Sequence, residues 1–425
     1  MTLRRAQLFA RRLAHLAALE ASQWLPPELL AQRQLHHLRR VVRAASTTRL
    51  YGDRFREAGV GASDLHALED LARFPTVERV DLMEGYPDDC VTRPLRADDV
   101  VFHTSGSSGR FLEVACSAET NAFLDAVYAR ALFNAGYRPW DRIAYFWWSD
   151  PIPPSLYERL GLMRKHLLRS DGDPEEQLAQ LEALRPDVIY HFPSCMVAIA
   201  KRLRPGSALR PRVIVCHGEL MTPESRAVIE EAFGCHVHDQ YGAQEVNRIA
   251  WDCRAHRGLH VDAESVHVEI LVGDRLAEPG EEGEVVLTSL RNTLMPLVRY
   301  RIGDLGRIEP RPCPCGRGLP LLTLSGGRMD DQLLLPSGRL IGPRRIVPLV
   351  ERFEGFRQFR VVQTGAARVE VLLVKAPDAP PDLEHGLGDA LRGLFEEELD
   401  VDVRAVDEIR LTGRGKLRCV ERAFS

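Results

Sequence analysis

Residues 104–109 read TSGSSG, a run in which hydroxyl side chains and glycines are mixed. The hydroxyls and the main-chain amides around the glycines can converge on phosphate oxygens, because glycine permits close approach and grouped N–H dipoles attract anions. The positions are Thr104, Ser105, Gly106, Ser107, Ser108 and Gly109. The run lacks the GxxxxGK[ST] pattern of a Walker A motif, and taken alone it also fits a flexible linker.

Lysine is rare in this chain, which makes each lysine informative. Among 56 basic residues the only lysines are Lys165, Lys201, Lys375 and Lys416. Lys416 stands in LTGRGKLR, between glycines and arginines near the C-terminus. A compact ammonium on a flexible stem suits a mobile element that reaches a reacting phosphate for one step. The alternative is a basic surface loop.

Two further segments place a carboxylate close to glycine. Glu245 ends QYGAQE (240–245), which follows a strand-like run, and a hard carboxylate suits a magnesium ion that also holds phosphate oxygens. Asp304 lies in YRIGDLGRI (300–308), where it could accept hydrogen bonds from both hydroxyls of a ribose. The alternatives are a solvated strand end for Glu245 and an ordinary β-turn for Asp304.

A separate group of cysteines and histidines has the composition of a zinc site. Cys253 lies in WDCRAHRGLH together with His256 and His260, and Cys313 and Cys315 form a Cys-x-Cys pair in RPCPCGRG. Three thiolates and one imidazole make a closed tetrahedral set, which indicates a structural rather than a catalytic ion. Reduced cysteines in a loop are the alternative.

The order of the predicted elements indicates an α/β protein with two domains. Helical periodicity dominates residues 1–100, including 28–45 and 64–74, and the N-terminal stretch fits an amphipathic helix better than a transit peptide. From about residue 100, strand-like and helical runs alternate, with a β-rich part after 258. We predict a large layered α/β domain over 1–327, comprising a helical portion (1–100) and a core (101–327), and a small mobile α+β domain over 328–425. The helix of the small domain is expected at 386–399.

The composition is that of a globular protein with more than one domain. Its 425 residues are 45% hydrophobic and 27% charged, with a formal net charge of −4. This charge argues against a general nucleic-acid or anionic-membrane surface. No apolar run approaches the roughly 20 residues needed to cross a bilayer. Nine scattered cysteines, an odd number, indicate a reducing compartment, so the cytoplasm is expected.

The chemical segments occur in an order that resembles the adenylate-forming superfamily of acyl-CoA synthetases and adenylation domains. The chain looks most like the branch of phenylacetate–CoA ligase and the CapK-like proteins, which shares the helical N-terminal portion, CHGELMTPESR (216–226) and CPCGRGLP (313–320). The resemblance covers nearly the whole chain. It departs at Phe111 and Leu112, where the superfamily usually has Pro and often Lys, and at Gln244, where Thr is common.

The resemblance implies roles for the segments. Lys416 would neutralise charge as a carboxylate attacks the α-phosphate of ATP, Glu245 would hold magnesium, and Arg328 in GRMDD would contact the nucleotide. Asp330 would be the hinge of the small domain. The implied nucleotide contacts further include Tyr241 at the adenine, Gly218, Glu219, Gln240, Gly242 and Asp304, together with TSGSSG. The implied acyl pocket comprises Ala243, Trp147, Trp148, His191, Phe192 and His217. For zinc, the resemblance favours His260 over His256.

The expected function is ATP- and magnesium-dependent activation of a small or aromatic carboxylic acid as an acyl-adenylate, followed by transfer to coenzyme A. One alternative keeps the adenylation but uses an amine or a carrier protein as acceptor, or stops at adenylylation. Another is a non-catalytic nucleotide-binding homologue. Relatives suggest a homodimer, and the arginine-rich N-terminal helix could dock a partner.

Overall fold

The computed structural model describes residues 3–103, 112–147, 156–328, 332–377, 379–409 and 419–423, with the side chains of 3–6, 156–157, 326–328, 344 and 348 left out. The chain divides into two compact units, Met1–Tyr137 with His238–Leu324, and Arg138–Val237 with Ser325–Ser425. The boundary predicted between a large domain (1–327) and a small domain (328–425) stays a prediction.

The N-terminal segment of the first unit is helical, as its periodicity predicts. Pro27 stands in the first turn of its helix, where the missing N–H would have no helical partner. Thr48 caps the next helix by accepting a hydrogen bond from the main chain of Tyr51. The helices are α1 (Leu3–Ser22), α2 (Pro27–Ala45), α3 (Arg49–Glu57) and α4 (Arg79–Gly85).

The helix predicted over 64–74 is wrong. Two 3-10 turns form instead, η1 (Ala62–Asp64) and η2 (Glu69–Arg73). The carboxylate of Asp70 accepts hydrogen bonds from the main-chain N–H groups of His66 and Ala67, at 2.6 and 2.8 Å. These local bonds satisfy backbone groups that an α-helix would otherwise have to pair, and they therefore compete with it.

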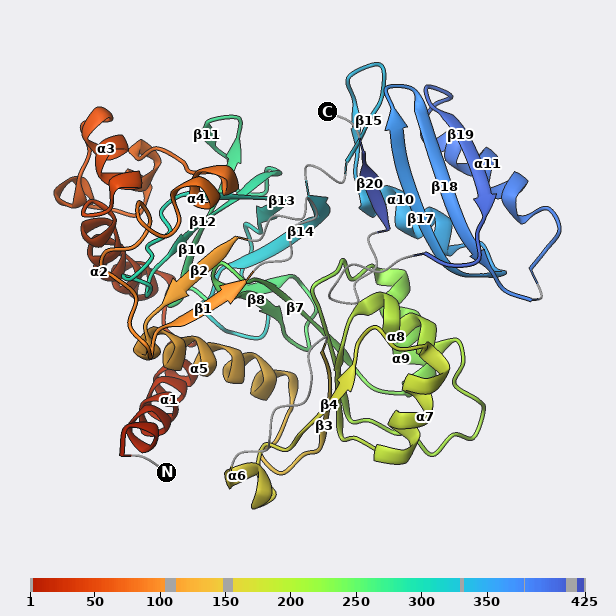
Figure 1. Ribbon diagram of the computed structural model, residues 1–425, viewed down its shortest axis with the longest axis horizontal. Helices are drawn as coiled ribbons and strands as arrows, with labels where there is room; N and C mark the ends of the chain where they lie inside the picture. Colours follow the sequence, from red (N-terminus) through yellow and green to blue (C-terminus); the bar gives the residue numbers. More distant parts are fainter. Residues whose placement is uncertain are drawn as a thin grey trace. The chain divides into compact units, whose positions relative to one another are not determined.

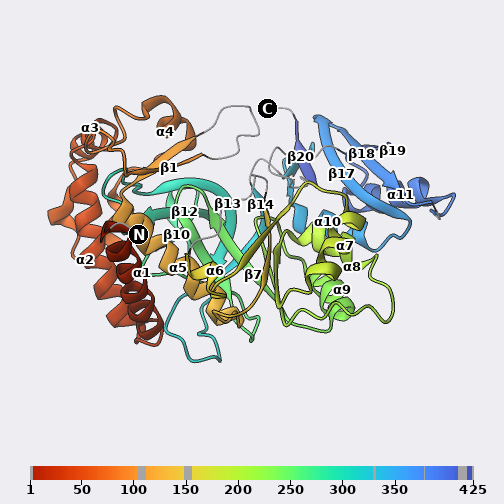
Figure 2. The same ribbon diagram turned by 60° about the horizontal axis from the view of Figure 1, so that its bottom comes forward.

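The β-rich part of the first unit is confirmed. Its strands lie side by side in the order β11-β10-β12-β13-β14-β9-β8-β7. They are β7 (Val237–Ala243), β8 (Asn247–Asp252), β9 (Leu259–Val261), β10 (Val266–Val272), β11 (Arg275–Leu276), β12 (Gly283–Ser289), β13 (Tyr300–Ile308) and β14 (Leu321–Arg328). Helix α5 (Ala118–Ala135) packs against α1 and β8, and α2 lies against β12 (Figures 1 and 2). A separate hairpin joins β1 (Val100–His103) to β2 (Glu113–Cys116).

The second unit begins with a parallel sheet in the order β6-β5-β3-β4. Its elements are β3 (Ile143–Trp147), α6 (Leu156–Arg159), β4 (Lys165–Arg169), α7 (Pro174–Leu184), β5 (Val188–His191), α8 (Pro193–Ala200), β6 (Val213–His217) and α9 (Pro223–Phe233). Because the strands are parallel, their carboxyl ends share one edge of the sheet, where open α/β sheets place their ligands.

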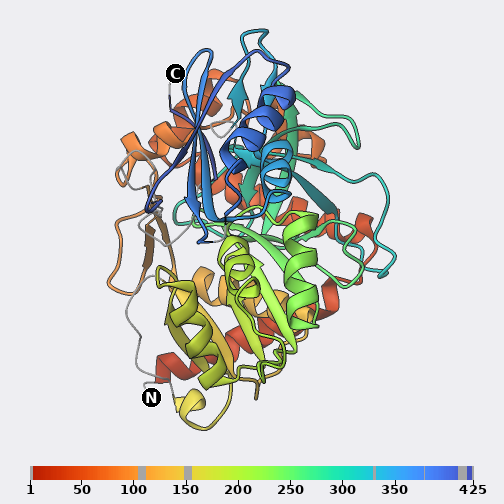
Figure 3. The same cartoon turned by 90° about the vertical axis from the view of Figure 1, so that its right-hand side faces the viewer.

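The C-terminal segment forms a four-stranded sheet in the order β19-β18-β17-β20, with two helices against one face (Figure 3). Its elements are β15 (Leu333–Leu334), β16 (Leu340–Ile341), α10 (Pro343–Glu351), β17 (Phe356–Gly365), β18 (Arg368–Lys375), α11 (Leu383–Leu394), β19 (Asp400–Ala405) and β20 (Val420–Arg422). Helix α11 ends before the predicted residue 399, because Phe395 turns into the core and Glu396 and Glu397 take positive φ. The α+β prediction is confirmed. In the part of the chain that the structure describes, no helix is long and apolar enough to span a membrane.

Candidate active site

Two predicted nucleotide contacts, Tyr241 and Asp304, meet in the first unit. The Tyr241 hydroxyl donates a hydrogen bond to Asp304 Oδ2 over 2.5 Å. Asp304 lies on β13 next to Gly303, which has φ 82°, where the pairing of β12 with β13 shifts register. A bulge of this kind re-aims the side chains beside it. Both side chains are half-buried, so a ligand can reach them.

The predicted magnesium ligand, Glu245, follows β7 and is held by two donors. Its Oε1 accepts hydrogen bonds from the Tyr300 hydroxyl at 3.1 Å and from Arg79 Nη1 at 3.2 Å. The Glu245 side chain is 3% exposed. Among the described residues, no hydrogen bond reaches its second oxygen, Oε2, which leaves one carboxylate oxygen for a hard cation. The residues present therefore fit a magnesium ion.

The start of the QYGAQE segment lies on strand β7. Gly242 lies on β7, where a Cβ atom would stand 2.6 Å from the main-chain oxygen of Asn247, so only glycine fits this approach. Ala243 pairs with Asn247 at the turn into β8. The side chain of Gln240 is 1% exposed, and its amide has no hydrogen-bond partner among the described residues. A buried amide of this kind is a candidate for a ligand contact.

In the second unit, the predicted acyl-pocket residues divide between two faces of the parallel sheet. His217 stacks on Tyr190, with ring centroids 4.2 Å apart, and Tyr190 stacks on Tyr145 at 4.5 Å. Trp147, two residues after Tyr145, lies on the same face with its ring centroid 5.5 Å from that of Tyr145. This aromatic face, Tyr145, Trp147, Tyr190 and His217, ends at the carboxyl edge of the sheet.

The other face is closed. His191 is fully buried and stacks on Phe146 at 3.8 Å, and burial lowers the pKa of His191 to about 3. Phe192 is also fully buried, with its ring tilted against His217 at 5.0 Å. Phe192 therefore packs against His217 of the aromatic face, and His191 packs on the opposite side of the strand. The exposed Gly218 has φ 76°, and the carboxylate of Glu219 accepts a hydrogen bond from the main-chain N–H of Ser194 in the first turn of α8.

The predicted zinc ligands converge in the first unit. Cys253 Sγ and Cys313 Sγ are 3.7 Å apart, and Cys315 Sγ is 3.4 Å from His260 Nε2. All four ligand atoms lie within 4.8 Å of one another. In a tetrahedral zinc site, two sulfur ligands lie about 3.8 Å apart, and a sulfur and a nitrogen ligand lie about 3.6 Å apart. The four atoms therefore fit a zinc ion. His256 belongs elsewhere, since its Nδ1 is 2.8 Å from Asp252.

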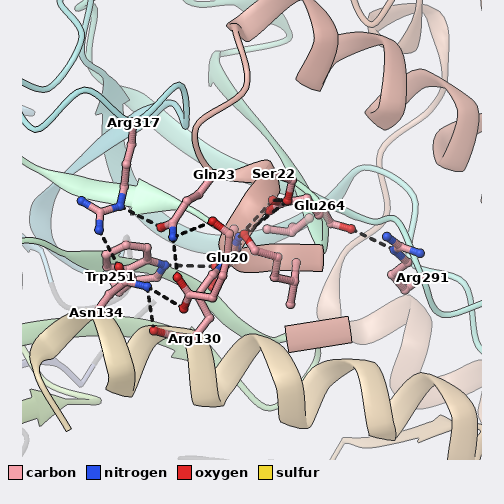
Figure 4. A network of polar contacts seen from close by, with 12 residues as sticks. Glu20, Ser22, Gln23, Arg130, Asn134, Trp251, Glu264, Arg291 and Arg317 are labelled. Atoms are coloured by element: carbon pink, nitrogen blue, oxygen red, sulfur yellow. Dashed lines mark hydrogen bonds and ion pairs between the residues drawn. The ribbon is translucent and has the colours of Figure 1, made fainter. Parts of the chain in front are cut away.

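A buried polar network ties this cysteine loop to the N-terminal helices (Figure 4). Arg317, two residues after Cys315, donates from Nε to Gln23 at 2.7 Å and also to Asn134, and its guanidinium lies over the ring of Trp24. Deeper in the same network, the fully buried Arg130 makes ion pairs with Asp262 and Glu264. Glu264 also accepts a hydrogen bond from Ser22.

Several predicted site residues lie outside the described residues: 104–109, Trp148, Asp330 and Lys416. Arg328 is the last residue of β14, and its side chain is among those not described. The structure thus brings together Tyr241 with Asp304, and the four zinc ligands, within the first unit. In the second unit it brings together Trp147 and His217.

Sequence reasoning missed the residues that hold Glu245. Tyr300 opens the YRIGDLGRI segment, so its closeness to a motif carboxylate was a usable signal. Arg79 stands in the helical portion, in no motif, and nothing in the sequence connects it with Glu245. Tyr145 and Tyr190 could have been found from the two-residue alternation of the strands, which places them on the same face as Trp147.

Comparisons with known proteins identify the family. No protein-family model matches the chain. The phenylacetate-coenzyme A ligase of Pseudomonas putida is 30% identical over 332 residues, covering 75% of each chain, and that of Escherichia coli (strain K12) is 28% identical over 319 residues, covering 72% of each.

Solved structures give the same fold. A 2-hydroxyisobutyryl-CoA ligase in complex with 2-HIB-AMP matches with a TM-score of 0.77 and 23% identity, covering 94% of this chain and 90% of that one. An anthranilate CoA ligase in complex with anthranoyl-AMP matches with a TM-score of 0.56 and 15% identity, over 75% of this chain and 65% of that one. With its sequence relatives and its ligase fold, the chain belongs to the phenylacetate-coenzyme A ligase family and is an adenylate-forming ligase of the CoA ligase type.

Proposed function

We propose that this enzyme uses ATP and magnesium to convert a small or aromatic carboxylic acid into an acyl-adenylate, which it then transfers to coenzyme A. The observation that carries the proposal is the meeting of Tyr241 with Asp304 in the same unit as the buried carboxylate of Glu245. Solved ligases of the same fold hold 2-HIB-AMP and CoA, which are the two kinds of ligand that the proposed steps require.

The nucleotide would be held by groups that the structure describes. Asp304 accepts the ribose hydroxyls, Tyr241 lies beside the adenine, and the buried amide of Gln240 offers a donor and an acceptor to the base. Glu245 would hold magnesium through Oε2, where the ion neutralises phosphate charge. The TSGSSG run and Arg328 would complete the phosphate contacts.

In the first step, a carboxylate oxygen of the acid attacks the α-phosphorus of ATP, and the bond to the departing pyrophosphate breaks. The Lys416 ammonium stabilises the charge that develops on the phosphoryl oxygens. In the second step, the thiol of coenzyme A loses its proton and attacks the acyl carbon, and AMP leaves. Between the two steps, the small domain would rotate about Asp330. This rotation would withdraw Lys416 and present a different face of the small domain for the transfer to coenzyme A.

The aromatic face of the second unit supports a flat or small acyl group. Tyr145, Tyr190 and His217 form a continuous stack, and aromatic rings favour offset or edge-on packing of a further ring. Trp147 extends this face, and the ring of Phe192 packs against His217. We therefore place the acyl group of the substrate against these side chains. A cytoplasmic location is proposed as well, since all nine cysteines are free.

The proposed reaction is tested by pyrophosphate release from ATP and magnesium over a panel of aryl and short-chain acids, with and without coenzyme A. Release is expected to depend on one class of acid and to rise when coenzyme A is added, because the thiol removes the bound adenylate. Acid-dependent release that coenzyme A does not stimulate would favour an amine or carrier-protein acceptor. No release with any acid, while ATP still binds, would reject the ligase proposal in favour of a non-catalytic homologue.

We also propose a structural zinc ion at Cys253, His260, Cys313 and Cys315. Protein purified without a metal-affinity resin is expected to contain about one equivalent of zinc, and Cys313→Ser is expected to lose the ion and melt at a lower temperature, because a closed site contributes its binding energy to folding. Elemental analysis and thermal melting measure both. Cys235→Ser, a half-buried cysteine of the second unit, is the matched control and should keep the zinc. Less than about half an equivalent in the wild type contradicts the proposal.

A further inference from the structure

A cavity of about 240 Å³ lies among α1, α2, α5 and the loop after β12, in the N-terminal portion of the first unit. Its lining includes His15, Arg33, His37, Phe123, Glu264 and Arg291. A second hollow, of about 270 Å³ along α2, shares Arg33 and His37 with it. None of these residues belongs to the nucleotide, acyl or zinc sites described above.

The cavity has more positive than negative charge available to a ligand. Arg33 makes no ion pair among the described residues. Arg291 donates from Nε to the main-chain oxygen of Glu264 at 3.0 Å, and its guanidinium lies 4.2 Å from the centre of the Phe123 ring. Like Arg33, it makes no ion pair among the described residues. The single lining carboxylate, that of Glu264, is already bound by Arg130 and Ser22 (Figure 4).

One histidine of the cavity, His37, adds a buried ring nitrogen, Nδ1, that lacks a hydrogen-bond partner among the described residues. Burial, together with the nearby cations, lowers the pKa of His37 to about 4. The groups facing His37 are Arg291 from the loop, His36, Arg40 and Arg33 on α2, and His15 and Glu264 across the cavity. Without a counter-charge, His37 is therefore neutral near neutral pH.

We propose that this cavity is a binding site for a small tetrahedral oxyanion, phosphate or sulfate, held by Arg33, Arg291 and His37. Such an ion supplies the negative charge that the two guanidinium groups lack, and charge-assisted hydrogen bonds from arginine to phosphate are strong. The cavity is smaller than the roughly 300–1,000 Å³ of clefts that hold drug-sized ligands, which favours a free ion over a nucleotide. The inference does not rest on the proposed catalytic function.

An ion at this position would join two separate parts of the fold. Arg33 and His37 belong to α2, and Arg291 belongs to the loop after β12. The next residue of that loop, Asn292, donates to the main-chain oxygen of Ala115 on β2, at 2.9 Å. The bound ion would thus hold α2 to the loop that supports β2.

The test is isothermal titration of the full-length protein with inorganic phosphate, compared with Arg33→Gln, Arg291→Gln and the matched control Arg43→Gln. Arg43 is an exposed residue of the same helix that does not line the cavity. A dissociation constant of about 1 mM is expected for the wild type and the control, and each cavity variant should weaken binding about tenfold through loss of a charged hydrogen bond. Glycerol 3-phosphate, which carries the same chemistry on a larger group, should bind more weakly than the free ion.

A second arm uses sulfate, which keeps its charge of −2 over the range tested. A bound anion raises the pKa of His37 above its value in the empty cavity, so sulfate affinity should increase as the pH falls from about 7.5 to 5.5. His37→Asn should remove this pH dependence while leaving binding at the higher pH nearly unchanged. Failure of wild-type protein to bind phosphate or sulfate would overturn the proposal. Binding that is unaffected by both arginine substitutions would also overturn it, since the ion would then lie elsewhere.

Discussion

Replacing Lys416 by alanine is expected to slow acyl-adenylate formation at least about 100-fold, because a single group that stabilises developing phosphoryl charge contributes on this scale. The binding of ATP should change little, since the lysine acts chiefly on the transition state. The measurement is acid-dependent pyrophosphate release under single-turnover conditions, together with the dissociation constant of ATP.

Two comparisons make this result specific. Lys375→Ala is the matched control, because Lys375 forms an ordinary ion pair with Glu384 at 2.8 Å and should be dispensable for catalysis. Thioester formation from added acyl-adenylate and coenzyme A should also survive in Lys416→Ala, since that step does not need the lysine. Equal adenylation by the variant and the wild type would remove Lys416 from the active site.

The largest stability effect is expected for Arg130→Met. Arg130 is fully buried between Asp262 and Glu264, with two of its bonds to Glu264 at 2.9 Å. Removing the guanidinium leaves two buried carboxylates without their counter-ion, which should lower the free energy of unfolding by about 3–5 kcal/mol. Urea denaturation monitored by circular dichroism measures the change.

Matched variants separate charge from packing in this experiment. Arg11→Met removes an exposed arginine of α1 that pairs with Glu119 of α5, and it should change the free energy of unfolding by less than about 1 kcal/mol. The triple variant Arg130→Met, Asp262→Asn and Glu264→Gln removes all three charges and should recover part of the lost stability. If it is as unstable as Arg130→Met alone, the cost comes from packing, and the charge explanation is incorrect.

The sequence predicted the fold class because local patterns determine it here. The alternation of strands and helices from residue 143 to 233 and the β-rich part after 258 are both found, since each buried run has the length and period of its element. The failures are local as well. Asp70 diverts the backbone of residues 64–74 from a helix, and Glu396 and Glu397 end α11 early, through side-chain and backbone details that periodicity does not contain.

Residues of the candidate site could be predicted only where they belong to a recognisable sequence motif. Cys253, His260, Cys313 and Cys315 were found from residue type and spacing, with the resemblance choosing between the histidines, and the structure places their ligand atoms together. Contact between Tyr241 and Asp304 was not predictable, because it depends on the register shift at β13. The support of Glu245 by Arg79 joins residues 166 positions apart, a tertiary contact without a local signal.

The hydrogen bond between Tyr241 and Asp304 has a consequence for the nucleotide binding proposed above. Before a nucleotide binds, the half-buried carboxylate of Asp304 already accepts a hydrogen bond from the Tyr241 hydroxyl. A ribose hydroxyl that reaches Asp304 exchanges one O–H donor for another, so the carboxylate need not be stripped of a partner as the complex forms. The same exchange would break the hydrogen bond that holds the Tyr241 side chain. Binding of the ribose and movement of the Tyr241 ring would therefore be coupled.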